Sequence, residues 1–419
     1  MATSQSPTEP TPIDHLSSLP DALLVTILSF LPTEIAARTS VLSRRFQHLW
    51  KASPAVDLAF HKFKFQSFEA VASGALLSRQ PSNPLLRLHL NVTSLIYSTF
   101  ISSLLTHSHS LGLRHLTLNG DILQADDEDI QSIVRTVFFI SSLESLSISL
   151  DAFSIVLPSA TSLTHLKSLF ITPPVISAQV ERLLLEFCCL DHLRLSELIQ
   201  SSAAMVNLSS STVKRLELFA ICPFGQETCS VGLFMPSLEF LFLSQRSSWP
   251  LPCIRADIPL LRKSVIKLPL LRHRHVTAVA QLLNSITHVE ELSLDLNESE
   301  GYPFCNLLEP GKEAPVFPNL KHLDAHMCFH ELNFEAAVSL LCRSPALQSL
   351  KLVHKDADEF TSWTREKRKM YDWRSKLPRN VNGNRQHAYF SNLHLKENNK
   401  GFMKLLNKSS TRKKMKAHN

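Results

Sequence analysis

Histidine and cysteine side chains occur at spacings that could hold a metal ion. His326, Cys328 and His330 alternate along the chain, and Cys188 adjoins Cys189. Such nitrogen and sulfur donors suit Zn²⁺, which takes four convergent ligands in a structural site. Cys328 falls at the turn position of a repeat described below, and neither group has further ligands nearby in the sequence. We therefore predict structural roles for these residues and no metal site.

Residue patterns that support catalysis are missing from the sequence. The 419 residues include only 9 glycines, and neither GxGxxG nor GxxxxGK[ST] occurs. A glycine-rich loop that binds nucleotide phosphates is therefore not expected. No serine or cysteine lies on a glycine-flanked elbow that would expose a nucleophile. We predict a chain that is not an enzyme and takes no cofactor.

The net charge of +6 is unevenly distributed. Residues 1–360 carry a net charge of −7, and residues 361–419 carry +13. The longest apolar stretch, residues 22–31, is interrupted by Thr26 and Ser29 and is shorter than the roughly 20 residues of a membrane helix. We therefore predict no membrane span. We also expect that any attraction to nucleic acid comes from residues 361–419 alone.

The first twelve residues contain no basic residue and no apolar core, so a secretory signal is not expected. Their Pro, Ser and Thr content predicts a disordered leader over residues 1–12. Eight cysteines in a chain without such a signal favour free thiols in a reducing compartment. We expect the chain in the nucleus, the cytoplasm or both.

A leucine pattern recurs from residue 85 onward. The hexapeptide L-x-x-L-x-L, with conservative replacements, recurs every 23 to 31 residues, apart from one gap of 51 that predicts a degenerate unit over residues 261–268. Leucines at positions 1, 4 and 6 would point inward from a parallel strand, while positions 3, 5 and 7 point outward. Intervening helices are predicted over residues 130–140, 180–188, 276–286 and 334–342. The windows begin at Leu85, Leu113, Leu143, Leu166, Leu190, Val213, Leu238, Val289, Leu320 and Leu347. The pattern predicts an α/β fold, an irregular leucine-rich-repeat solenoid of parallel strands with outer helices.

Outward positions in four neighbouring repeats combine aromatic and charged residues, a composition typical of protein interfaces. An alternative stays open, in which loops cover this face and bury the phenylalanines as core. The candidate target-binding residues are Phe170, Arg194, Arg215, Glu217, Phe219, Phe240 and Phe242.

A short helical module precedes the repeats. Ser18 and Asp21 have the spacing of a capping box, which predicts a helix beginning there. Two apolar stripes follow, one through Leu23 and Ile27 and another through Leu24 and Leu28, and Pro32 ends the helix. Two further short helices are expected before residue 52. A unit of about 45 residues is too small to bury all this apolar surface, so the excess implies either a protein partner or packing on the following domain.

Residues 13–58 resemble a plant-type F-box. The resemblance is carried by Leu-Pro-Asp at 19–21, Ile-Leu-Ser-Phe-Leu-Pro at 27–32, Thr-Ser-x-Leu-Ser-Arg-Arg at 39–45 and Leu-Trp at 49–50. Phe46, where the family more often has Trp, is a mild departure. The resemblance implies a three-helix module that docks a Skp-family adaptor and, through it, a cullin-RING ubiquitin ligase. Its implied adaptor-binding residues are Leu19, Pro20, Leu23, Leu24, Ile27, Leu28, Leu31, Pro32, Leu42 and Trp50.

An F-box followed by irregular repeats resembles the plant F-box/leucine-rich-repeat proteins as a whole. We therefore expect the following domains: leader 1–12, F-box 13–58, linker or first helical unit 59–84, solenoid 85–357 and basic segment 358–419. The last segment resembles the FBD segment of that family only faintly, and a degenerate FBD and a disordered segment both remain open. Its runs at 365–369 and 412–416 are typical of a solvated face, and secondly of a nuclear-import signal.

Three functional hypotheses follow. The first is the substrate-recognition subunit of an SCF-type ubiquitin ligase, which binds its adaptor through the F-box and an unknown target protein through the repeats. The second is a nucleic-acid-associated protein that uses the basic segment, which is disfavoured because no domain built to read bases accompanies the charge. The third is an F-box scaffold that acts without ubiquitin transfer.

Overall fold

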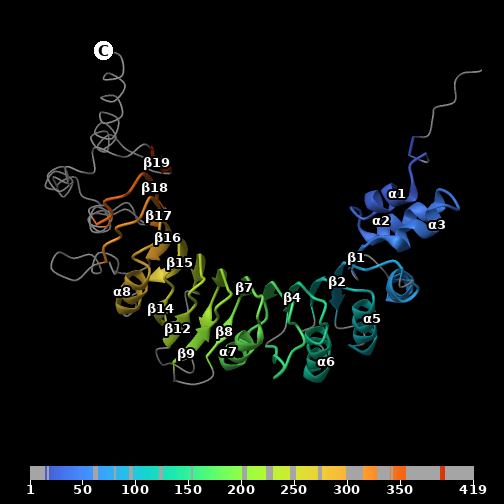
Figure 1. Ribbon diagram of the computed structural model, residues 1–419, viewed down its shortest axis with the longest axis horizontal. Coiled ribbons are helices and arrows are strands. Elements are labelled where there is room, and N and C mark those ends of the chain that lie inside the picture. Colours follow the sequence, from blue (N-terminus) through green and yellow to red (C-terminus); the bar gives the residue numbers. More distant parts are fainter. Residues whose placement is uncertain are drawn as a thin grey trace, which may run out of the picture. The chain divides into compact units, whose positions relative to one another are not determined.

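A computed structural model gives the arrangement of most of the chain (Figure 1). It divides into two compact units, Met1–Asp151 and Ala152–Asn419. The described residues are 15–16, 18–59, 65–79, 82–93, 98–121, 126–151, 154–200, 205–222, 230–245, 252–271, 276–298, 315–327, 340, 343–354 and 387–391.

The first unit opens with a helical module. It contains α1 (Asp21–Leu28), α2 (Thr33–Arg38), η1 (Thr39–Val41), α3 (Phe46–Leu49) and η2 (Trp50–Ala52). Three α-helices therefore form where the sequence predicts them. They are short because Pro32 interrupts the chain after α1 and 3₁₀ turns separate the later pieces.

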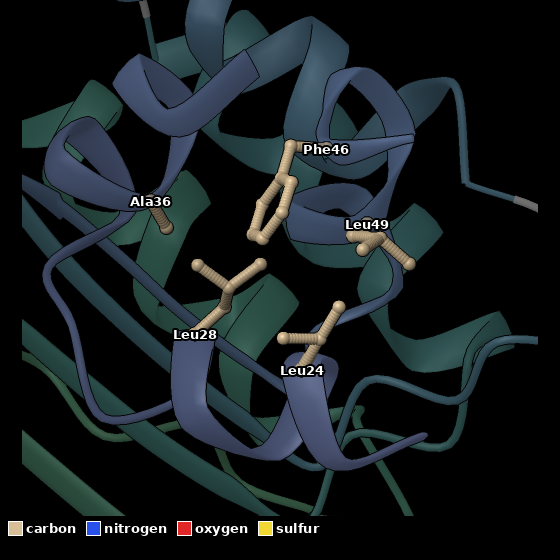
Figure 2. Packing of buried hydrophobic residues seen from close by; sticks show 5 residues of the cluster. All are labelled: Leu24, Leu28, Ala36, Phe46 and Leu49. Atoms are coloured by element: carbon tan, nitrogen blue, oxygen red, sulfur yellow. The ribbon is translucent and has the colours of Figure 1, made fainter. Parts of the chain in front are cut away.

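The module has a core of its own (Figure 2). Leu24 and Leu28 of α1 point toward Phe46 and Leu49 of α3, with Ala36 of α2 beside them. Leu24 retains 1% and Leu28 retains 3% of its surface. One predicted stripe of α1 is therefore buried inside the module rather than against the following domain.

The start of α1 differs from the sequence prediction. Pro20 is the N-cap residue, no side chain caps the helix, and the Ser18 hydroxyl donates instead to the His15 carbonyl at 2.7 Å. Proline has a fixed φ suited to a helix start. Because Pro20 takes the cap position, the predicted capping box between Ser18 and Asp21 is wrong, although the helix begins where expected.

A strand and a buried arginine follow the helical module. Strand β1 (Ala55–Ala59) donates a hydrogen bond to α2, from the Asp57 amide to Thr33 Oγ1 at 2.7 Å. Beyond α4 (Phe65–Ala72) and the π-helical turn η4 (Ser73–Leu77), Arg79 is buried and donates to the backbone carbonyls of Ser53, Ala75 and Pro84. Burial lowers the pKa of Arg79 to about 10, so its guanidinium is still charged at neutral pH.

The rest of the first unit consists of repeats. Strands β1, β2 (Arg87–Thr93), β3 (His115–Asp121) and β4 (Ser145–Asp151) pair in parallel and in sequence order. Helices α5 (Ser98–Ser110) and α6 (Asp127–Phe138) connect them on one side of the sheet (Figure 1). The sheet thus begins one strand earlier than the leucine windows predict, at β1.

Two glycines shape these repeats. Gly112, at φ 82°, ends α5 in a Schellman arrangement, in which Leu113 N donates to Ser108 O and Gly112 N to His109 O. Gly120 of β3, at φ 157°, lies so close to β2 that a Cβ there would be 2.1 Å from the Val92 carbonyl oxygen. Glycine is needed at the first position for its φ and at the second for both φ and space.

In its described residues, the second unit continues the same architecture with nine parallel strands in one sheet. Their order is β5, β7, β10, β13, β15, β16, β17, β18 and β19. Their bounds are β5 (Ser168–Ile171), β7 (His192–Leu195), β10 (Arg215–Leu218), β13 (Phe240–Ser244), β15 (Lys263–Leu271), β16 (Glu291–Glu298), β17 (His322–Met327), β18 (Ser349–His354) and β19 (His387–Ser391).

The leucine windows predict these strands well in both units. Each of the ten predicted windows contains a strand that begins two residues after the window does. The degenerate unit predicted over residues 261–268 is β15. Leucines at positions 1, 4 and 6 are buried, as in Leu113, Leu116 and Leu118. The predicted leucine-rich-repeat solenoid is confirmed.

The outer side of the second unit contains strands as well as helices. Helices α7 (Ser177–Glu186) and α8 (Val276–Ser285) form as predicted, but β9 (Val206–Ser209), β12 (Ser230–Phe234) and β14 (Cys253–Asp257) form a parallel sheet between them. A second small sheet joins β6 (Val175–Ile176), β8 (Leu198–Ile199) and β11 (Ile221–Cys222). Short outer strands therefore lie where the sequence predicts no helix, in a solenoid expected to carry helices on its outer side.

A buried glutamine connects two successive repeats of the second unit. The Gln245 side chain accepts from Ile221 N and donates to Ile221 O, each at 2.9 Å. Gln245 retains 5% of its surface. Because a buried amide requires partners on both ends, this pairing satisfies Gln245 and the Ile221 backbone together.

Several predictions concern residues outside the described ranges. These are the leader 1–12, Cys328, His330, the helix at 334–342 except Leu340, and the basic segment 358–419 except β19. Strand β19 pairs in parallel with β18, from Ser349 opposite His387 to Val353 opposite Ser391. The sheet therefore extends into the basic segment.

Candidate functional site

The helical module has large apolar side chains on its surface as well as in its core. Val41 is 87% exposed and Phe30 is 78% exposed, values that isolated folding would not favour for such large side chains. We call this set the apolar face. Its members are Leu23, Ile27, Phe30, Leu31, Ile35, Val41 and Leu42.

The predicted adaptor-binding residues divide between the apolar face and the core. Leu23, Ile27, Leu31 and Leu42 belong to the apolar face. Leu24 and Leu28 are core residues, because α1 turns their side chains toward α3 (Figure 2). Of the others, Pro20 is exposed, and Leu19, Pro32 and Trp50 are partly buried.

Sequence reasoning left three members of the apolar face out of the adaptor-binding set. Phe30 lies three residues after Ile27 and so continues the stripe that begins at Leu23, a signal available in the sequence. Ile35 and Val41 could not be assigned that way, because α2 and η1 are too short to show a period.

The second unit carries a different kind of surface on outward strand positions. Strands β5, β7, β10, β13 and β15 are consecutive neighbours, so their positions 3, 5 and 7 form three rows. We call the set below the cation–aromatic strip. It comprises Phe170, His192, Arg194, Arg215, Glu217, Phe219, Phe240, Phe242 and Lys267.

Each cation of the strip lies over an aromatic ring. The Arg215 guanidinium carbon is 3.7 Å from the Phe240 ring centre, and that of Arg194 is 4.5 Å from the Phe219 ring centre. Lys267 Nζ is 5.6 Å from the Phe242 ring centre. Such contacts are worth about 0.5 to 1 kcal/mol each at exposed sites.

The aromatic rings also contact one another and a histidine. The Phe219 and Phe242 rings have centres 4.7 Å apart, and Phe170 meets His192 edge to face at 4.6 Å. All four phenylalanines of the strip are half-buried rather than enclosed as core. The rings therefore form a floor on which the charged groups lie.

A single carboxylate lies among the cations. Glu217 is buried, accepts from Arg215 Nε at 2.8 Å, and lies 3.7 Å from Arg194 and 3.2 Å from His192 Nε2. Burial lowers the pKa of His192, and Arg215 and Arg194 lower it further, against the opposing effect of Glu217. His192 is therefore neutral at pH 7, and the charge balance involves Glu217 and the two arginines.

The seven predicted target-binding residues lie together. The register sets Arg194 beside Phe170 and Glu217, and Arg215 beside Phe240. Sequence reasoning missed His192 and Lys267. His192 occupies position 3 of its window, so the same rule could have found it, whereas Lys267 lies in the degenerate repeat, where no window marks the position.

Chemistry-bearing groups elsewhere are sparse in the described part of the chain. No group of three or more His, Cys, Asp or Glu side chains there could hold a metal ion. Among the same residues, no helix is long and apolar enough to cross a membrane. Cys188 and Cys189 are exposed free thiols with their sulfurs 3.9 Å apart, and the hydrogen bond with Cys188 raises the pKa of the Cys189 thiol.

Comparisons with known proteins agree with both parts of the chain. Residues 16–54 match the F-box domain. An F-box/FBD/LRR-repeat protein of Arabidopsis thaliana is 28% identical over 361 residues, 84% of this chain and 77% of the relative. An F-box/LRR-repeat protein of the same plant is 25% identical over 82% of this chain and 73% of the relative.

The fold defines a repeat protein whose first residues form a helical module. The chain carries an F-box domain at residues 16–54 and is similar over most of its length to F-box/LRR-repeat proteins of Arabidopsis thaliana. Proteins of this kind are generally non-catalytic substrate receptors of SCF ubiquitin ligases.

Proposed function

We propose that this chain is the substrate-recognition subunit of an SCF-type ubiquitin ligase. In this role the apolar face docks a Skp-family adaptor, and the cation–aromatic strip holds a target protein. The chain itself performs no chemistry and takes no cofactor or metal. It brings the target to a cullin-RING assembly whose catalytic parts are on other chains.

The apolar face is the observation that carries the proposal. The module buries Leu24 and Leu28 in its own core yet leaves seven large apolar side chains on its surface. A buried area of this kind contributes about 25 cal/mol for each Å² removed from water, so a partner that covers the face would gain substantially. The F-box match over residues 16–54 supports a Skp-family adaptor as that partner.

Co-expression with a Skp-family adaptor tests the docking step. The intact protein should copurify with the adaptor, and Ile27→Asp combined with Leu42→Asp should abolish the complex, because both side chains are exposed and their loss leaves the core intact. Leu185→Asp is the matched control, since Leu185 is 76% exposed on α7, outside the module. Absence of a complex with the intact protein would overturn the proposal.

Ubiquitin transfer separates a ligase subunit from a scaffold. Proteins bound to the second unit should become ubiquitinated when the adaptor, the cullin and the RING protein are supplied, and the Ile27→Asp and Leu42→Asp double variant should prevent transfer. Stable binding of a target without any transfer would instead identify an F-box scaffold.

We also propose that the protein acts in the nucleus, the cytoplasm or both. Residues 361–419, most of the basic segment, support this assignment by their charge of +13. A fluorescent fusion of the full chain should enter the nucleus more than a fusion that lacks residues 392–419, which spares β19. Equal distributions would remove the segment's proposed role in import.

A further inference from the structure

The cation–aromatic strip has more positive than negative charge. Across β7, β10 and β13 the outward charged positions hold Arg194 and Arg215 against the single carboxylate of Glu217. Lys267 of β15 adds a third cation, which has no ion pair among the described residues. One carboxylate cannot neutralise three permanent cations, so the strip attracts an anionic group.

The arginines are positioned in advance for such a group. Arg215 uses only Nε toward Glu217, and its terminal nitrogens have no hydrogen-bond partner in the described part of the chain. Arg194 approaches Glu217 at 3.7 Å, beyond hydrogen-bond distance. Each guanidinium carbon lies over a ring, and N–H groups that Glu217 does not engage can donate to a further carboxylate.

Neighbouring charges limit where the anion can lie. On the β16 side, Glu291 pairs with Lys263 at 2.8 Å, and Asp295 is the register partner of Lys267. On the β5 side, the strip ends in the half-buried ring of Phe170 against His192. The positive region is therefore bounded by acidic residues on one side and by an aromatic surface on the other.

The aromatic floor identifies the rest of the ligand. Phe219 and Phe242 contact each other and are half-buried, so a partner that covers them would remove further apolar surface from water. A ligand that carried only charge would leave this surface exposed. The complementary partner has carboxylates next to aromatic or aliphatic side chains.

Building on the proposed function, we infer that the cation–aromatic strip docks an acidic segment of the target protein, in extended form, with carboxylates on Arg194, Arg215 and Lys267 and an apolar side chain on the Phe219 and Phe242 rings. Four adjacent strands, β7 to β15, span about 14 Å at about 4.8 Å per strand. An extended chain rises about 3.3 Å per residue. Acidic residues about four positions apart would therefore reach both ends of the strip.

Peptide binding to the full-length protein, prepared with and without its adaptor, tests the inference. The probe is a labelled seven-residue peptide with Glu at positions 1, 5 and 7, Phe at position 3 and Ser between them, so that in extended form these four side chains share one face. The comparison peptide replaces each Glu by Gln. Fluorescence anisotropy should show at least about tenfold tighter binding of the acidic peptide. Equal affinity of the two peptides, or tighter binding of a single-stranded oligonucleotide of equal length, would overturn the inference.

Charge-reversed variants locate the binding site. Lys267→Glu should weaken acidic-peptide binding by about tenfold or more, and Arg194→Glu should do the same. Arg255→Glu is the matched control, because Arg255 is exposed on β14 in a different sheet. If Lys267→Glu and Arg255→Glu bind the acidic peptide equally well, the strip is not the site.

Adaptor copurification keeps the two proposals separate. The strip variants should retain the adaptor, which also shows that they are folded. If the adaptor complex forms and no variant alters peptide binding, the docking inference fails while the proposed function stands. If the intact chain binds the acidic peptide but never the adaptor, the proposed function fails and only the strip's chemistry stands.

Discussion

Arg45 joins the beginning of α3 to the beginning of α1 through Asp21. Its Nε donates to Asp21 Oδ1 at 2.7 Å, and its NH2 group donates to the backbone carbonyl of Leu19. The Asp21 side chain is 65% exposed, so the ion pair contributes only about 0.2 to 1 kcal/mol. Its importance is positional, because it fixes the first residues of α1 against α3 while the core below supplies the stability.

Two leucines of α1, one buried and one exposed, should respond differently to truncation. Leu28→Ala should lower the free energy of unfolding by about 2 to 5 kcal/mol, because it opens a cavity beside Phe46 and Ala36. Leu23→Ala, at a side chain 50% exposed, should change it by about 0.5 kcal/mol or less and weaken adaptor binding instead. Denaturant unfolding and adaptor copurification measure the two effects, and a stable Leu28→Ala protein would contradict the core assignment.

Arg79 should be important for the stability of the first unit. Arg79→Met removes the donors to the carbonyls of Ser53, Ala75 and Pro84 and should cost about 2 to 3 kcal/mol, since hydrogen bonds from a charged group are worth more than neutral ones. Arg87→Met, at an exposed position of β2, is the control and should change stability little. Thermal unfolding of both variants measures the difference, and equal melting temperatures would contradict the stabilising role of Arg79.

The pH response of His192 should report on Glu217. Burial holds the His192 pKa below 6.5, so neutral His192 is favoured in the folded state, and its contribution to stability is present above pH 6.5 and declines as the pH falls through the lowered pKa. Glu217→Gln should lower this pKa further, because it removes the charge and the hydrogen bond that raise it. NMR titration, with His192→Asn for assignment, measures the shift. A higher pKa in Glu217→Gln would be inconsistent with this arrangement.

Alanine should be tolerated very differently at two glycines. Gly120→Ala places a methyl group 2.1 Å from the Val92 carbonyl oxygen and should prevent normal pairing of β2 with β3. Gly112→Ala meets nothing within 4 Å and is opposed only by its φ of 82°, which costs about 1 to 2 kcal/mol. Circular dichroism with thermal unfolding compares them, and similar melting temperatures would refute the close approach at Gly120.

The inner strands could be predicted because their information is local. In each window the leucines at positions 1, 4 and 6 already specify which side chains face inward. Pairing with the next strand leaves the same side chains facing inward. Strand β1 was missed because Val56 and Leu58 alternate over too short a stretch to complete the window. The outer strands β9 and β12 were missed because neither begins inside an L-x-x-L-x-L window.

Burial of individual side chains in the helical module could not be predicted from periodicity. Both stripes of α1 are apolar, and Leu24 and Leu28 are the buried pair because Phe46 and Leu49 approach that side. This choice depends on residues about twenty positions away. On the strip, the outward rows were predictable, but the placement of Arg194 over Phe219 and Arg215 over Phe240 depends on strand register and side-chain rotamers.

The Gln245 amide has a consequence for how the second unit opens. Because one side chain holds both backbone groups of Ile221, 24 residues earlier, neither repeat can detach without leaving buried polar groups unpaired. Local unfolding at this point should therefore involve both repeats at once. The two repeats form one cooperative unit, so a substitution that destabilises either repeat should destabilise the other as well.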